Sequence, residues 1–127
     1  AQALEPQLVE WRRTLHRHPE VGFDLTQTKA LVKKALTEMG YEPKDCGKAG
    51  VIALAGGKKP GKTILLRGDM DALPIQEESG VDYASEVSGK MHGCGHDMHC
   101  LLYTSPSPRY AHGNDAGCCP TAQGARG

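Results

Sequence analysis

The chain has 127 residues, of which 39% are hydrophobic and 24% are charged. These proportions are typical of a globular protein rather than a disordered one, and the length suits one small domain. Lysine and arginine together number 15, as do aspartate and glutamate, so there is no positive excess to attract nucleic acid or an anionic membrane. No apolar run approaches the ~20 residues of a membrane-spanning helix. We therefore expect neither a nucleic-acid partner nor a membrane partner.

The five cysteines do not form the evenly spaced set that is typical of secreted disulfide-rich domains. Cys46 stands alone, Cys94 and Cys100 flank histidines, and Cys118 is followed directly by Cys119. This pattern favours a reducing compartment, and we expect a cytoplasmic protein.

The first segment is predicted to be a helix because its apolar residues recur at spacings of four, three and four. These residues are Leu4, Leu8, Trp11 and Leu15. Pro19 disfavours helical geometry at His18 and therefore marks the end of the helix. His16 and His18 are either metal ligands or residues that interact with the helix dipole and its free carbonyl groups, and the second role is the more common one.

A second helix is predicted over residues 26–39, with Gly40 as its left-handed cap. The apolar stretches 51–55 and 62–67 predict two strands that form a hairpin within a mixed sheet, joined by a turn rich in glycine, lysine and proline. Asp69 and Asp71 follow the second of these strands. In open α/β sheets, ligands bind at the carboxyl ends of strands, so this position favours a site.

The strongest local signal is the segment 91–99, Met-His-Gly-Cys-Gly-His-Asp-Met-His. Thiol and imidazole groups are the usual ligands of zinc and related metals. Cys94 and His96 are two residues apart, so in an extended segment both side chains point to one side. Asp97 is either a ligand or a group that orients an imidazole ring. The alternative is a flexible histidine-rich loop that binds no metal.

A second candidate site is the Asp-Met-Asp sequence at residues 69–71. Carboxylates spaced in this way are a common ligand pattern for hard cations. By itself the pattern is weak, because aspartate also caps turns.

Three segments in this order, residues 12–23, 66–74 and 91–99, resemble the amidohydrolase branch of the aminoacylase/carboxypeptidase metallopeptidases. Hippurate hydrolases and deacetylases of N-acetyl-diaminopimelate belong to that branch. The resemblance covers about residues 3 to 99. It implies an α/β fold in which this chain supplies the N-terminal part of a dinuclear-metal, aminopeptidase-like catalytic domain, with helices packed on a mixed sheet.

The resemblance also implies an activity, a cofactor and site residues. The activity is hydrolysis of the amide bond of N-acyl amino acids of the hippurate or acetyl-amino-acid type, with two divalent metal ions, Zn²⁺ or Mn²⁺. Cys94 and His96 match metal ligands, and Asp71 matches a catalytic aspartate that supports a metal-ligand histidine. Asp69 falls where related branches place that histidine, which leaves its role open. Members of the family form homo-oligomers through an inserted domain.

The family's general-base glutamate, its later glutamate and histidine ligands and its inserted domain have no match in this chain. A two-metal catalytic site needs more ligands than Cys94, His96 and the two aspartates offer. We therefore expect the 127-residue chain to be inactive by itself.

The resemblance divides the chain into residues 1–99, the N-terminal portion of the catalytic domain, and residues 100–127, a tail outside the family pattern. The tail is rich in proline, cysteine and glycine, and residues 100–109 resemble a translated sequencing-library adapter. We expect it to be disordered or a read-through artefact. The alternative function is a small zinc-stabilised binding module built from Cys94, His96, Cys100 and Cys118 or Cys119.

Overall fold

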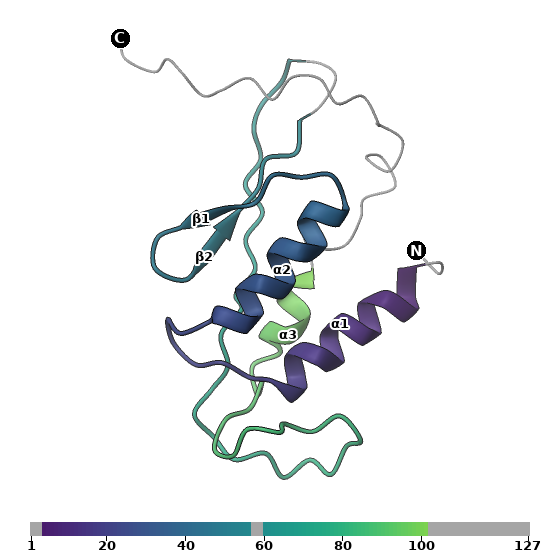
Figure 1. Cartoon of the computed structure of the whole chain (residues 1–127), viewed down its shortest axis with the longest axis vertical. Coiled ribbons are helices and arrows are strands. Elements are labelled where there is room, and N and C mark those ends of the chain that lie inside the picture. The colour runs from purple at the N-terminus through teal and green to yellow at the C-terminus, as the bar shows by residue number, and fades with distance from the viewer. Residues whose placement is uncertain (1–3, 57–59, 102–127) are drawn as a thin grey trace.

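A computed structural model describes residues 4–56 and 60–101, and the predicted tail therefore lies almost entirely outside the described residues. The elements in chain order are α1 (Glu5–Arg17), α2 (Thr26–Glu38), β1 (Lys44–Cys46), β2 (Gly50–Ile52) and α3 (His96–His99). In Figure 1, α1 and α2 lie at an angle to each other with α3 behind them. No helix in the described part of the chain is long and apolar enough to cross a membrane.

The two predicted helices are confirmed. Helix α1 has Pro6 in its first turn, where a missing backbone N–H costs nothing, and it ends one residue before His18. Helix α2 buries Val32 and Leu36 as the spacing predicts. Gly40 follows α2 with a φ of 85°, the left-handed conformation that glycine adopts without strain.

The predicted pairing of residues 51–55 with residues 62–67 is wrong. Strand β2 pairs instead with β1, in an antiparallel hairpin whose register places Lys44 opposite Ile52 and Cys46 opposite Gly50. Residues 62–67 form no strand in the described structure. Their apolar composition gives them strand propensity, but a strand also needs a neighbour to receive its backbone hydrogen bonds.

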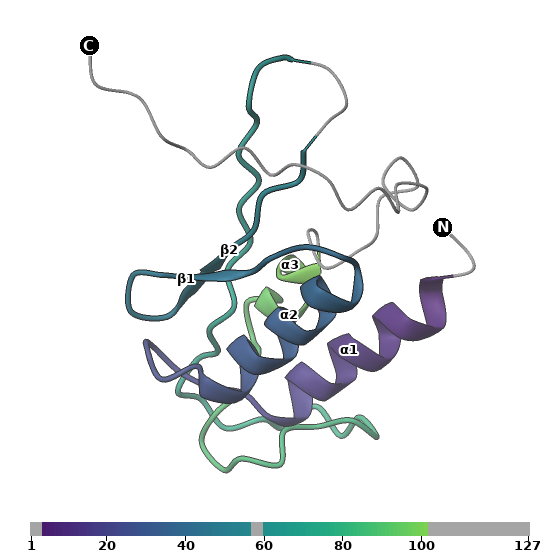
Figure 2. The ribbon, with the colours of Figure 1, turned by 45° about the horizontal axis from the view of Figure 1, so that its top comes forward.

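The apolar core lies where the helices meet the hairpin and the C-terminal end of the described chain. Its buried members are Leu15, Leu25, Val32, Leu36, Met70 and Cys100, and the partly buried Val51 of β2 packs against them. Leu101 packs against the same cluster. Figure 2 shows that the chain after β2 runs out from this core and that the chain after residue 60 returns to it.

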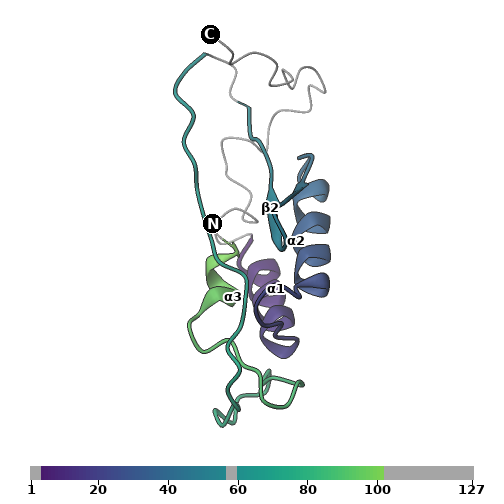
Figure 3. The ribbon, with the colours of Figure 1, turned by 90° about the vertical axis from the view of Figure 1, so that its left-hand side faces the viewer.

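The segment that carries Asp71 is held on both sides by backbone hydrogen bonds. Ala72 N–H donates to the carbonyl of Glu20 at 2.7 Å, and Leu73 exchanges two hydrogen bonds with Met91 at 2.8 and 3.0 Å. These bonds bring together three segments far apart in the sequence, and they place residues 69–71 beside α3. Figure 3 shows this extended segment running beside α3.

Candidate metal centre

His96 is the best-oriented metal-ligand side chain in the predicted motif. It begins α3 directly after Gly95, whose φ of 77° turns the chain sharply. Its ring Nδ1 lies 2.9 Å from the backbone carbonyl oxygen of Asp71 and 3.1 Å from the carboxylate oxygen Oδ1 of the same residue. A carbonyl oxygen can only accept, so Nδ1 carries a proton, and in the neutral form of the ring the lone pair is on Nε2. Asp71 thus holds the tautomer of His96 that can bind a metal.

Three side chains of the metal-ligand type converge at this place. One donor atom each from Asp69, His96 and His99 lies within 4.8 Å of the other two. The rings of His96 and His99 stack, with centroids 5.9 Å apart and planes inclined by 12°. Asp69 also accepts a hydrogen bond at 2.8 Å from the exposed guanidinium of Arg67.

The structure brings together some of the predicted site residues and leaves one apart. Asp71 and His96 are in contact, as described above. Cys94 is an exposed free thiol, and its sulfur is outside the converging set of Asp69, His96 and His99. His99 belongs to the predicted motif but was not singled out there. The signal that could have found it is its spacing from His96, because residues three apart lie on the same side of a helix.

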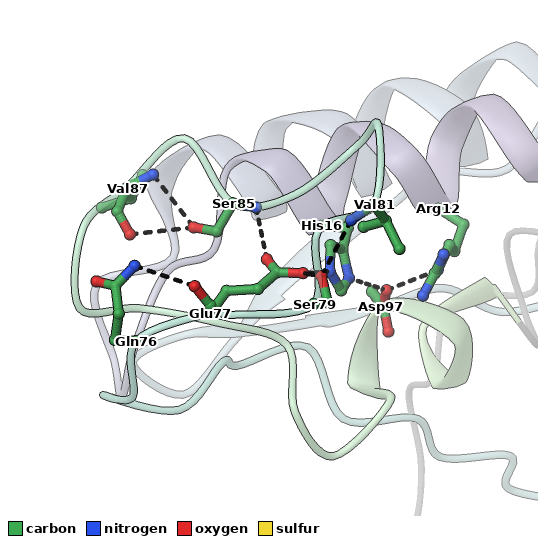
Figure 4. Close-up of polar contacts among 9 residues, drawn as sticks. All are labelled: Arg12, His16, Gln76, Glu77, Ser79, Val81, Ser85, Val87 and Asp97. Carbon is green, nitrogen blue, oxygen red and sulfur yellow. Dashed lines mark hydrogen bonds and ion pairs between the residues drawn. The ribbon is translucent and has the colours of Figure 1, made fainter.

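A buried polar network lies on the other side of α3 (Figure 4). Asp97 Oδ2 lies 2.8 Å from His16 Nδ1 and forms an ion pair of 2.8 Å with Arg12 Nε. The other ring nitrogen of His16, Nε2, lies 3.0 Å from Glu77 Oε1. Both carboxylates are almost fully buried. His18, by contrast, points outward with 44% of its side chain exposed.

Hydrogen bonds within the network determine the ionisation of Glu77. Burial alone would raise the pKa of Glu77, but hydrogen bonds from the Ser79 hydroxyl, the Ser85 backbone N–H and His16 outweigh it and lower the pKa to about 2. An ionised carboxylate only accepts hydrogen bonds. His16 therefore donates from Nε2 to Glu77, while Asp97 lies against His16 Nδ1 and Arg12 on the other side of the ring. Burying charged groups costs less where they are paired with hydrogen-bonding partners in this way.

His16 was predicted either to bind a metal or to interact with the dipole and free carbonyl groups of its helix. Neither prediction anticipated that its partners would be carboxylates. The ring sits near the end of α1 as expected, but it binds carboxylates from residues 61 and 81 positions away. Asp97 does orient an imidazole, although the ring is that of His16 rather than that of His96. Sequence spacing could not identify this pair, because no local pattern links α1 to α3.

Comparison with known proteins shows which family the chain resembles. The model of peptidase family M20/M25/M40 matches residues 65–102, which include both metal-ligand segments. The chain is 46% identical over 97 residues to N-acetyl-L-cysteine deacetylase of Bacillus subtilis, a match that covers 76% of this chain and 23% of the relative. The chain belongs to the M20 family of metallopeptidases and amidohydrolases.

Further M20 relatives agree with this assignment. N-acetyldiaminopimelate deacetylase of Halalkalibacterium halodurans is 41% identical, with 78% of this chain and 27% of the relative covered. The crystal structure of the Bacillus subtilis protein YxeP, a dinuclear metal-binding peptidase of the M20 family, superposes with a TM-score of 0.74 at 42% identity. That match covers 79% of this chain and 29% of YxeP. The expected α/β fold of an M20 catalytic domain is thereby confirmed, and the chain spans about a quarter of the length of these relatives.

Proposed function

We propose that the protein to which this sequence belongs is a metal-dependent hydrolase of the amide bond of N-acyl amino acids. The observation that carries the proposal is His96 held by Asp71 in its metal-binding tautomer, within a motif shared with the M20 family. Two relatives are named as deacetylases of N-acetyl amino acids, which supports this substrate class. Residues 1–99 would form the N-terminal portion of the catalytic domain and residues 100–127 a tail, of which Cys100 and Leu101 still pack against the core of the domain.

The residues of this chain would supply part of the metal centre. His96 would bind an ion through Nε2, and the exposed thiol of Cys94 would bind as a thiolate. Asp71 would keep the His96 ring in place, as a carboxylate behind a ligand histidine commonly does. The residues fit a divalent ion, and the two ions of the proposal, Zn²⁺ or Mn²⁺, would polarise the amide carbonyl and activate a water molecule.

The 127-residue chain is proposed to be inactive by itself. Around Asp71 and His96, the described residues do not supply both a complete set of ligands for two metal ions and a glutamate that could act as general base. Such a base takes the proton of the attacking water and passes it to the leaving amine. The remaining ligands, the base and the surface for homo-oligomer formation would come from segments that match the other three quarters of the relatives.

The test uses the chain in two contexts. The 127-residue protein, supplied with Zn²⁺ or Mn²⁺, is assayed for release of amino acid from N-acetyl-L-cysteine. A chimera then carries residues 4–99 in place of the matching segment of the Bacillus subtilis deacetylase. We expect no turnover from the first protein. From the chimera we expect turnover that is lost on chelation and restored by metal.

Variants of the chimera assign the roles. His96→Ala should abolish turnover, and Asp71→Asn should lower it by about 10–100-fold, as for other groups that orient metal ligands. The exposed His18→Ala variant is the matched control and should be as active as the unchanged chimera. A folded chimera with the deacetylase's secondary structure but no metal-dependent turnover would overturn the proposal.

A further inference from the structure

We propose that Arg12 and His16 of α1 are positioning residues for helix α3, because they hold the carboxylate of Asp97 and thereby fix the direction of its neighbour His96. This role rests on the proposed function, in which His96 binds a metal. Helix α3 has only four residues. A helix this short is not held by its own hydrogen bonds, so contacts with other elements must fix it.

The contacts of Asp97 supply that anchor. Its side chain is 1% exposed, and its Oδ2 lies 2.8 Å from Arg12 Nε and 2.8 Å from His16 Nδ1. Apolar packing has no preferred direction, whereas polar contacts depend on angle and therefore oppose rotation of α3 about its axis. Successive residues are about 100° apart around a helix axis. A helix held at Asp97 thus directs His96 at a set angle toward Asp71, whose carbonyl oxygen lies 2.9 Å from the ring Nδ1.

The ring of His16 is itself prevented from turning. Its Nε2 lies 3.0 Å from Glu77 Oε1, and Glu77 Oε2 accepts a hydrogen bond of 2.6 Å from the backbone N–H of Ser85. Tyr83 meets the same imidazole edge-on, with ring centroids 5.5 Å apart. Figure 4 shows the resulting line of contacts from Glu77 through His16 to Asp97. The loop that carries Glu77 therefore braces the residue that holds α3.

Arg12 and Arg13 provide a matched comparison, because both lie over the ring of Tyr83 but only one of them pairs with Asp97. Their guanidinium carbons are 4.7 and 4.8 Å from the ring centroid. Arg12 also pairs with Asp97, whereas Arg13 pairs with the exposed Asp82 at 3.8 Å. Loss of Arg13 therefore removes a similar contact with Tyr83 and leaves the anchor of α3 in place.

The first experiment follows the ring of His96 in the metal-free 127-residue chain by nitrogen-15 NMR, which shows which ring nitrogen carries a proton. The pH is about 8, where imidazole is ordinarily neutral, and His96→Gln identifies the signals. In the unchanged chain we expect the proton on Nδ1. Arg12→Met should give a mixture of the two tautomers, because the ring is no longer held against Asp71, and Arg13→Met should not. Equal spectra from Arg12→Met and the unchanged chain would overturn the proposal.

Two substitutions of His16 separate positioning from stability. Asparagine and glutamine place an amide near the positions of histidine Nδ1 and Nε2, respectively. His16→Asn therefore keeps a polar group against Asp97, and His16→Gln keeps one against Glu77. We expect the tautomer of His96 to be kept in His16→Asn and mixed in His16→Gln, although both variants should unfold at a lower temperature than the unchanged chain.

An equal response of His96 in these two variants would show that His16 does not act through Asp97. If either variant does not fold, the arginine pair decides the question, because the side chains of Arg12 and Arg13 are 26% and 42% exposed and their replacement disturbs the core less.

The second readout is the affinity of the chimera for Zn²⁺. Arg12→Met and His16→Gln should weaken binding about tenfold, at the lower end of the losses found for groups behind metal ligands, and Arg13→Met should bind as the unchanged chimera does. Unchanged affinity of Arg12→Met in an active chimera would contradict the positioning role. An inactive chimera, beside mixed His96 tautomers in Arg12→Met, would instead contradict the hydrolase function and support the positioning of His96.

Discussion

At the scale of single residues, burial decides how similar side chains behave. Among the described residues, the thiols of Cys46 and Cys94 are exposed and that of Cys100 is buried. Burial, with a smaller contribution from the charge of Asp97, raises the pKa of Cys100 to about 12. Only the thiolate form is a good nucleophile. Cys100 is therefore packed in the core and, as a protonated thiol, a poor nucleophile.

We predict that Cys100 resists alkylation in the native chain. Iodoacetamide at mildly alkaline pH should modify Cys46 and Cys94 readily and Cys100 only slowly, whereas all three should react in denaturant. Mass spectrometry of the labelled peptides measures this directly. Labelling of Cys100 at the rate of Cys94 in the folded protein would contradict the buried position of this thiol.

Glu77 makes the stability of the fold dependent on pH in the acid range. Its pKa is about 2 in the folded chain against an ordinary value of 4.5. A depressed pKa means that the folded state favours the ionised form. Its contribution is therefore fully present above about pH 4.5 and is lost as the pH falls toward 2. We predict that the free energy of unfolding decreases across this interval, as measured by urea denaturation at a series of pH values.

The variant Glu77→Gln isolates this contribution. It keeps the shape of the side chain but removes the charge that accepts hydrogen bonds from Ser79, Ser85 and His16, so we expect a loss of about 1–3 kcal/mol at neutral pH. The acid-range decrease should be smaller in this variant. Glu86, which is exposed and lies 3.9 Å from His18, provides the control, and Glu86→Gln should leave the pH profile unchanged. An identical profile in Glu77→Gln and in the unchanged chain would show that Glu77 is not coupled to folding.

At the scale of elements, the hairpin of β1 and β2 depends on the absence of a side chain at Gly50. Gly50 lies opposite Cys46 in the register. A Cβ atom at Gly50 would lie 2.7 Å from the backbone carbonyl oxygen of Cys46, which is closer than such atoms approach each other. The backbone oxygen cannot rotate away as a side chain could, so the hairpin itself would have to shift.

We predict that Gly50→Ala destabilises the fold by about 1–3 kcal/mol, the usual cost of forcing extra atoms into a packed position. Gly56→Ala is the matched control, because a Cβ at Gly56 meets nothing within 4 Å. It should be neutral. Thermal unfolding followed by circular dichroism compares the two. Equal midpoints would mean that the strands can separate at Gly50 without loss.

At the scale of the whole molecule, the most unusual surface is the apolar segment Ile64–Leu66. These side chains are 82%, 81% and 69% exposed. Exposed apolar runs with unpaired backbone are surfaces on which chains associate. The matched segment makes up only about a quarter of each relative, so in them further chain is available to cover the corresponding residues.

We predict that the 127-residue chain self-associates through this segment. Ile64→Lys with Leu66→Lys should reduce association, measured by light scattering over a range of concentrations. The midpoint of thermal unfolding should not fall, because neither side chain belongs to the core. Lys62→Glu, a polar change at the edge of the segment, serves as the control for altered charge. Association of the double variant equal to that of the unchanged chain would place the contact elsewhere.

Features that depend on neighbouring residues could be predicted before the structure was known. The apolar spacing predicted α1 and α2 to within one or two residues of their ends, and Gly40 as the residue that follows α2. The order of three short motifs indicated the family, and one of them contains His96. These are local signals, since helical periodicity and turn preference act over a few residues.

Only the tertiary structure decided which distant groups meet. Strand propensity at residues 62–67 could not specify a partner, and the partner of β2 proved to be the short segment just before it. The pairing of His16 with Asp97 spans 81 residues, and that of His96 with Asp71 spans 25. Such contacts depend on the path of the whole chain, because the core and the backbone bonds at Ala72 and Leu73 bring those segments together. The hydrogen-bond donors gathered by this path keep Glu77 ionised, and the sequence carries no information about which distant donors surround a side chain.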